Sequence, residues 1–140
     1  MSKHLVFVYG SLRRGNPHPM SVRFPEAKFI AEAKVSGSLY DLGDYPGMQT
    51  RESVSLVTGE VYEVDDATLD EMDQFETSSH YLRKQIEVLL GGAGKTGWVY
   101  EPDPKHYDFE TLISSGDWIE YSRAKLRTKS ALHSPAKRDD

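Results

Sequence analysis

The chain has 140 residues, the length of one ordinary domain, and a domain of this size can bury a core without disulfides or a structural metal. It contains no cysteine, which excludes disulfide frameworks, thiolate catalysis and cysteine-ligated zinc. Its net charge of −5, from 22 acidic and 17 basic residues, disfavours a nucleic-acid-binding protein, which would normally carry a basic face.

The N-terminus is followed by an apolar run of only five residues. A secretory signal needs a longer apolar region with a small-residue cleavage site, and no stretch approaches the roughly 20 apolar residues of a membrane-spanning helix. We therefore expect a cytoplasmic protein, a monomer, that acts on a small molecule and has neither a nucleic-acid nor a membrane partner.

The first predicted element is a strand over residues 5–9, whose continuous apolar, β-prone sequence is typical of a strand buried on both faces. It ends in the turn Tyr9-Gly10-Ser11-Leu12. Consecutive backbone N–H groups at such a turn can bind an anion such as a carboxylate, although an ordinary strand exit has the same pattern. Residues 13–25 contain three prolines and are expected to form a loop with at most a short helical turn.

Three more strands are predicted before the first helix, over residues 29–35, 38–42 and 54–64. Gly37 is expected to act as a hinge between the first two strands, and residues 43–47, which are rich in turn formers, form a loop. Gly59 interrupts the third strand, where it indicates a bulge or the close approach of another group.

Residues 66–75 are expected to form a helix, with Asp65 and Asp66 available to cap it. Leu69, Met72 and Phe75 form its apolar stripe at helical spacing. One further residue of helix would place Glu76 almost directly above Leu69, on the side of the core.

A carboxylate on the core side of a helix is costly unless it is paired, protonated or used in a reaction. Burial would raise the pKa of Glu76 toward neutrality, where a carboxylate serves as a general base and then as an acid. A frayed helix end that exposes Glu76, or a structural ion pair with Arg83, is the alternative interpretation. Asp73 lies near the same stripe and is the rival candidate.

The second half of the chain predicts two further strands and a helix. Residues 81–90 alternate apolar and polar side chains, as in a half-buried strand, and the glycine-rich turn 91–94 leads into a strand at residues 98–100. A helix is expected after Gly116. We predict one domain over residues 1–126 and a disordered tail over residues 127–140. The many strands with short connections predict an α+β fold with a mixed, barrel-like sheet and flanking helices.

Several familiar catalytic and binding motifs are excluded. Gly94-Lys95-Thr96 resembles the end of a phosphate-binding loop, but Leu89 stands where that motif requires a glycine. The surroundings of Ser11 do not match a nucleophilic serine. The five histidines have no ligand spacing, so we expect neither a metal nor a cofactor. Of the eight tyrosines, Tyr81 is the favoured pocket residue because it closely follows Glu76.

Taken together, these segments resemble the γ-glutamylcyclotransferase superfamily, in its AIG2-like branch. The resemblance spans about residues 5 to 121 and includes the opening strand with its Tyr-Gly-Ser-Leu turn, the strand around residues 59–64, and the pair Phe75-Glu76 followed by Tyr81-x-Arg83. Residues 40–46 and 115–118 are also similar to that family.

The resemblance implies a barrel-like sheet with a pocket at the end of the first strand. It also implies a reaction in which the α-amine of a γ-glutamyl group attacks its own γ-carbonyl, releasing 5-oxoproline and an amine or amino acid. By this analogy Glu76 is the catalytic base and then acid, while backbone groups of Tyr9, Gly10, Ser11 and Leu12 hold the glutamyl portion of the substrate. Tyr81 is added to the predicted substrate pocket because of its position after Glu76.

Two other functions stay open from the sequence. One is a non-catalytic binding or regulatory protein that keeps the fold, and the other is an amide or ester hydrolase in which Glu76 activates water. For an enzyme, loops 13–25 and 43–50 are expected to recognise the leaving group.

Overall fold

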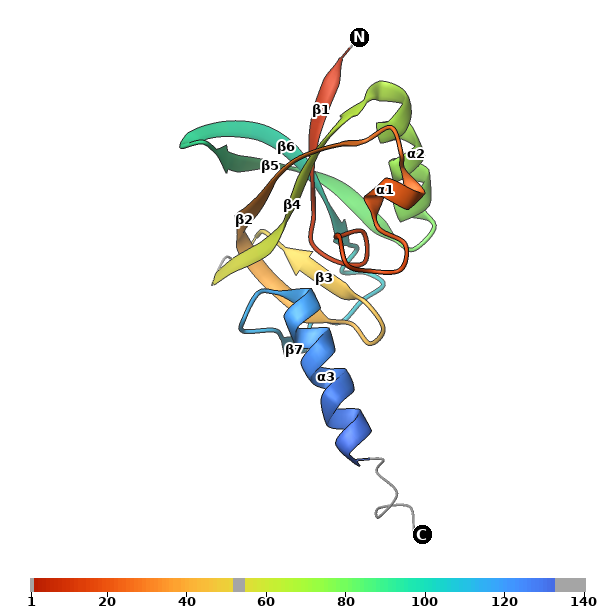
Figure 1. Ribbon diagram of the computed structural model, residues 1–140, viewed down its shortest axis with the longest axis vertical. Coiled ribbons are helices and arrows are strands. Elements are labelled where there is room, and N and C mark those ends of the chain that lie inside the picture. The colour runs from red at the N-terminus through yellow and green to blue at the C-terminus, as the bar shows by residue number, and fades with distance from the viewer. Residues whose placement is uncertain (1, 52–54, 133–140) are drawn as a thin grey trace.

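The computed structural model describes residues 2–51 and 55–132 (Figure 1). Within these residues the elements are, in chain order, β1 (Lys3–Val8), α1 (Met20–Arg23), β2 (Lys28–Asp41), β3 (Pro46–Gln49), β4 (Ser55–Asp65), α2 (Asp66–Thr77), β5 (Tyr81–Leu90), β6 (Ala93–Pro102), β7 (Thr111–Leu112) and α3 (Trp118–Leu132).

The strands form one mixed sheet that curves into a half-barrel. Its order is β3-β2-β4-β1-β6-β5, and β7 pairs with the end of β2 on the edge opposite β3. Strands β1 and β6 run parallel, with Val6 opposite Trp98, while the other pairs are antiparallel. The α+β, barrel-like architecture expected from the sequence is therefore confirmed.

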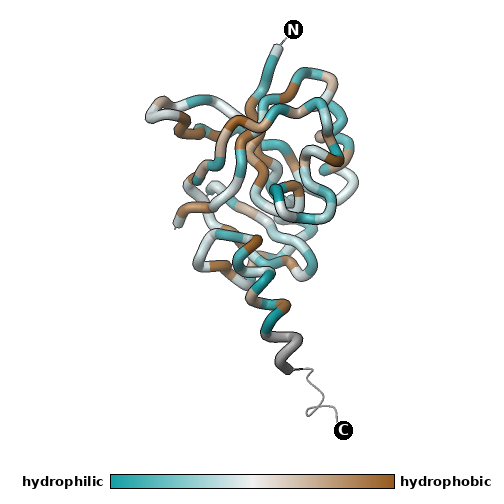
Figure 2. The backbone as a smooth tube through the Cα atoms, in the orientation of Figure 1, coloured by the Kyte–Doolittle hydropathy of each residue, from teal (hydrophilic) through white to brown (hydrophobic). Residues whose placement is uncertain are grey.

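Strand β1 is buried on both faces, as its continuous apolar sequence predicts. Val6 and Val8 belong to one hydrophobic cluster, which also contains Leu69 and Met72 of α2. Phe7 and Tyr9 belong to a second cluster on the opposite face. Apolar residues gather where the strands cross in the middle of the molecule (Figure 2).

Of the two features expected at Gly59, a bulge or the close approach of another group, the structure shows the close approach. A side chain at this position would collide with the carbonyl oxygen of Val8 and would lie 2.6 Å from the ring of Phe7. Glycine therefore lets β4 pass directly against the end of β1. The ladder irregularity of β4 lies elsewhere, between Phe29 and Ala31 of its partner β2.

The two strands predicted around Gly37 are one continuous strand that changes partners. Residues 28–37 of β2 pair with β4, and residues 38–41 pair with β3 and β7. The prediction of a loop over residues 43–47 is wrong for its last two residues, because Pro46 and Gly47 begin strand β3. Proline is tolerated there as the first residue of a strand at the sheet edge.

The C-terminal helix is longer than the sequence indicated. Asp41 of β2 anchors α3, because its carboxylate accepts hydrogen bonds from the Tyr121 hydroxyl at 2.6 Å and from Lys125 Nζ at 2.8 Å. The helix continues to Leu132 rather than ending before the predicted tail at residue 127. This stretch is rich in arginine, lysine, alanine and leucine, which are strong helix formers. The rest of the predicted tail, residues 133–140, lies outside the described residues.

Candidate active site

Three elements meet at the C-terminal end of β1: the turn after the strand, the end of helix α2, and the start of β5. Tyr9, the first residue beyond β1, is buried and links β1 to strands β3 and β6 through its hydroxyl. Its hydroxyl donates a hydrogen bond to the carbonyl oxygen of Tyr100 at 2.7 Å and accepts one from the N–H of Met48 at 3.1 Å. Burial raises the pKa of Tyr9 well above its usual value, so the phenol stays neutral.

The turn after Tyr9 is closed by hydrogen bonds to Gly10. The N–H of Arg13 donates to the Gly10 carbonyl at 3.0 Å, and Asn16 Nδ2 donates to the same oxygen at 3.2 Å. None of the hydrogen bonds among the described residues uses the N–H groups of Gly10, Ser11 or Leu12. All three residues line the cavity, and the anion-binding role predicted for this turn stays a prediction.

Helix α2 carries Glu76 in its last turn. Its N-cap is Asp65, which accepts a hydrogen bond from the N–H of Thr68 at 2.8 Å, and the helix ends at Thr77. Leu69 is buried as the predicted stripe requires. Phe75 differs from that prediction, because its ring is 36% exposed and lies at the edge of the cavity.

Glu76 is a half-buried carboxylate that has no hydrogen-bond or ion-pair partner in the described part of the chain. Burial raises its pKa from the ordinary 4.5 to about 7. Among the described residues, none donates a hydrogen bond to this carboxylate, and Arg83 instead pairs with Asp73 at 2.9 Å. Asp73 also accepts the hydroxyl of Tyr100 at 2.7 Å. The structure therefore contradicts both alternatives to a core-facing Glu76, fraying of the helix and pairing with Arg83.

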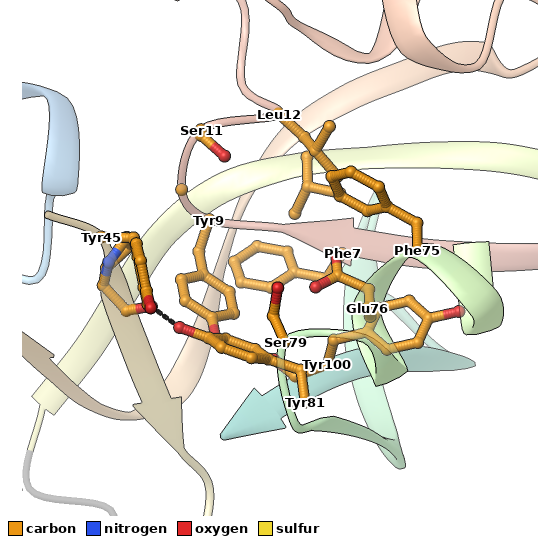
Figure 3. A pocket seen from close by; sticks show the side chains of 13 residues that line it. Phe7, Tyr9, Ser11, Leu12, Tyr45, Phe75, Glu76, Ser79, Tyr81 and Tyr100 are labelled. Carbon is orange, nitrogen blue, oxygen red and sulfur yellow. Dashed lines mark hydrogen bonds between the residues drawn. The ribbon is translucent and has the colours of Figure 1, made fainter. Parts of the chain in front are cut away.

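Tyr81 opens strand β5 and closes one wall of the cavity. Its hydroxyl donates a hydrogen bond to the carbonyl oxygen of Pro46 at 2.7 Å (Figure 3). Its ring packs edge-on against Tyr45 and Tyr107, with centroids 6.3 and 5.7 Å away. Burial raises the pKa of Tyr81, so its hydroxyl remains a neutral hydrogen-bonding group.

These residues surround one cavity of about 220 Å³ (Figure 3). It is lined by Phe7, Val8, Tyr9, Gly10, Ser11, Leu12, Tyr45, Pro46, Phe75, Glu76, Ser79, Tyr81 and Tyr100. All six site residues predicted from the sequence lie on its wall. Glu76 is the one charged side chain among the residues that line it.

The cavity also contains residues that sequence reasoning did not assign to a site. Tyr45 and Pro46 come from the segment 43–50 that was expected to recognise the leaving group, whereas segment 13–25 contributes no residue to the lining. Tyr100 was one of several strand tyrosines without a distinguishing signal. Ser79 follows Glu76 by three residues and had no signal beyond that proximity.

The described residues include no group of three or more histidine, aspartate or glutamate side chains placed to hold a metal ion. Among the helices described, none is long and apolar enough to cross a membrane. The cavity lining itself offers one carboxylate and the hydroxyls of tyrosine and serine.

Comparison with known proteins gives matches over nearly the whole chain. Residues 6–120 match the model of the family described as γ-glutamyl cyclotransferase, AIG2-like. A relative from Vibrio cholerae serotype O1, which carries a provisional γ-glutamylcyclotransferase name, is 40% identical over 119 residues, covering 84% of this chain and 97% of that protein.

A functionally named relative and a solved structure are also similar. The γ-L-glutamyl-butirosin B γ-glutamyl cyclotransferase of Niallia circulans is 34% identical over 125 residues, covering 83% of this chain and 76% of that protein. The crystal structure of an AIG2-like protein from Mus musculus superposes with a TM-score of 0.62 at 26% identity, covering 81% of this chain and 89% of that chain.

Proposed function

The chain belongs to the AIG2-like γ-glutamylcyclotransferase family, and we propose that it converts a γ-glutamyl compound into 5-oxoproline and a free amine or amino acid, with Glu76 as the catalytic acid and base. The observation that carries this proposal is the position and ionisation of Glu76. It is the one charged group among the described residues of the cavity wall, and burial raises its pKa to about 7.

The reaction needs one group that first takes a proton and later returns it. Glu76 removes a proton from the α-ammonium of the γ-glutamyl group, and the neutral amine then attacks the γ-carbonyl carbon. A new C–N bond closes the five-membered ring. The bond to the leaving nitrogen then breaks as Glu76 returns its proton to that nitrogen. The ring nitrogen gives up its second proton, so the products are 5-oxoproline and the leaving amine as an ammonium ion. A carboxyl with a pKa near 7 is suited to both transfers at neutral pH.

The attack is intramolecular, so the protein contributes orientation rather than a nucleophile. Holding the amine in line with the γ-carbonyl can lower the barrier by several kcal/mol. This requirement fits a cavity whose lining offers hydroxyls and one carboxylate but no cysteine.

The glutamyl carboxylate needs a partner on a wall without cationic side chains. We assign this role to the N–H groups of Gly10, Ser11 and Leu12, because hydrogen bonding within the described chain leaves them available at the cavity. Tyr9 and Tyr81 complete the substrate pocket as neutral walls, since both hydroxyls are already engaged with backbone groups.

The relative from Niallia circulans supports the reaction class, because the compound in its name carries a γ-glutamyl group that a cyclotransferase removes. The name of that relative does not identify the leaving group of this chain's own substrate. We assign recognition of the leaving group to the mouth of the cavity, where Tyr45 contributes an exposed aromatic ring.

The test is an assay of products from a panel of γ-glutamyl amines and γ-glutamyl amino acids. We expect stoichiometric 5-oxoproline and free amine from at least one member of the panel. Release of glutamate instead would indicate hydrolysis by activated water. Stabilisation by 5-oxoproline without turnover of any compound would indicate a binding protein, and either result would overturn the proposal.

A further inference from the structure

A second buried carboxylate lies behind the cavity rather than in it. Glu60 of β4 stands opposite Val8 in the antiparallel ladder with β1 and is only 3% exposed. It is not among the residues that line the cavity. A nearly fully buried carboxylate is costly unless it is paired, so its partners indicate what it does.

The partners of Glu60 come from the segment that continues the Gly10 turn. The N–H of Arg14 donates to both carboxylate oxygens, at 3.0 Å to Oε1 and 3.2 Å to Oε2. The Nε atoms of Arg13 and Arg14 each lie 3.8 Å from Oε2, so two guanidinium groups balance its charge. The hydroxyl of Tyr62, two residues along β4, supplies one more hydrogen bond at 2.9 Å.

These contacts join strand β4 of the sheet to the C-terminal end of the turn. Arg13 closes the turn by donating its N–H to the Gly10 carbonyl, and the next residue, Arg14, is held by Glu60. The Arg13 side chain is also bound to Asp117 beside helix α3, at 2.9 Å. Residues 10–14 are therefore fixed at both ends, by β1 on one side and by Glu60 on the other.

A peptide turn that presents N–H groups to a carboxylate binds best when those groups are already aligned. Ordering a loop during binding costs free energy that a preordered loop avoids. Among the described residues that line the cavity, the only charged side chain is acidic, so the alignment of the turn has a direct effect on the affinity for an anionic substrate.

We propose that Glu60 is a positioning residue that holds the turn 10–14 in its substrate-binding conformation. This inference rests on the proposed function only in taking the turn as the site of the glutamyl carboxylate. Glu60 itself touches neither the cavity nor the reacting atoms, and its effect is transmitted through the Arg14 N–H and the paired guanidinium groups.

The test compares Glu60→Gln with the wild-type protein in steady-state kinetics and in hydrogen–deuterium exchange. Loss of the charge removes the buried counter-ion that both arginines share, while Arg13 keeps its ion pair with Asp117 and Arg14 keeps its ion pair with Glu32. We expect KM to rise about tenfold, which corresponds to about 1.4 kcal/mol of binding free energy, while kcat changes much less. The pH dependence set by Glu76 should be unchanged, and amide exchange in residues 11–14 should become faster.

Glu63→Gln is the matched control, because it makes the same chemical change three residues along β4. In the described structure Glu63 has no hydrogen bond or ion pair to residues 10–14, so its KM and exchange should equal those of the wild type. If Glu60→Gln does not fold, Glu60→Asp preserves the charge but shortens the reach to Arg14, and it should also raise KM.

The two claims fail in different ways. If the wild-type protein forms no 5-oxoproline, the proposed function is refuted, and exchange in residues 11–14 still decides whether Glu60 orders the turn. Unchanged KM and unchanged exchange in a folded Glu60 variant would overturn the positioning role. A loss confined to kcat, with KM unaltered, would overturn it as well.

Discussion

Replacing Glu76 by glutamine should make the protein more stable at neutral and alkaline pH. The carboxyl is half-buried and, within the described structure, accepts no hydrogen bond and has no cationic partner that would stabilise its charged form. Glutamine preserves the size and polarity of the side chain but cannot ionise. The variant therefore isolates the free-energy cost of charging this one group.

The magnitude follows from the two ionisation constants. In the unfolded chain Glu76 titrates near its ordinary pKa of 4.5, and in the folded protein burial raises the pKa to about 7. The contribution of the Glu76 carboxyl to the free energy of unfolding is thus fully present below pH 4.5, where the group is neutral in both states. This contribution is lost as the pH rises through about 7, because the folded protein must then bury a charge. At about 1.36 kcal/mol for each pH unit between these values, the wild-type protein loses about 3 kcal/mol relative to Glu76→Gln.

The assay is urea unfolding of both proteins from pH 4 to pH 8, and the quantity of interest is the difference between their free energies of unfolding. We expect this difference to grow with pH in favour of Glu76→Gln and to level off above pH 7. Glu71→Gln, on the exposed face of the same helix, measures the effect of removing any glutamate from α2. A difference between Glu76→Gln and wild type that stays constant with pH, or that falls, would refute the burial argument.

Further predictions concern the rate and the framework of the site. The kcat/KM of the wild-type enzyme should fall about tenfold per pH unit below pH 7, because only ionised Glu76 accepts the ammonium proton; a profile flat down to pH 5 would contradict this. Gly59→Ala should destabilise the fold by about 1–3 kcal/mol in urea unfolding, because its methyl group collides with the Val8 carbonyl, and an unchanged midpoint would show that the strands can separate. Tyr9→Phe should cost about 1–3 kcal/mol in the same measurement, because two buried backbone groups lose their partner, whereas wild-type stability would mean that water replaces the hydroxyl.

Local patterns in the sequence predicted the elements that depend on neighbouring residues. Helical spacing placed Glu76 on the core side of α2, and the continuous apolar run of β1 indicated a strand buried on both faces. Both predictions are confirmed because periodicity reports directly on which side of an element is buried. The same spacing placed Phe75 in the core, yet its ring lies 36% exposed at the cavity edge, where there is less protein to cover it.

Features that depend on distant partners could not be predicted in this way. Strand β3 begins at a proline within a segment rich in turn formers, and it exists because β2 lies alongside to pair with it. The hydrogen bond that holds the end of the Gly10 turn joins Glu60 to Arg14, 46 residues away in the chain. The pairing of Arg83 with Asp73, which keeps Arg83 from pairing with Glu76, likewise requires β5 to fold back against α2.

The assignment of Glu76 as the acid and base is tested most directly by comparing Glu76→Gln with Asp73→Asn under saturating γ-glutamyl substrate. Both variants neutralise a carboxylate on helix α2, but only Glu76 lines the cavity. We predict that Glu76→Gln lowers kcat for 5-oxoproline formation by about 100-fold or more, as expected for loss of a general acid–base group, while Asp73→Asn retains most of the rate. Equal losses in the two variants, or a folded Glu76→Gln protein with wild-type turnover, would contradict the proposed mechanism.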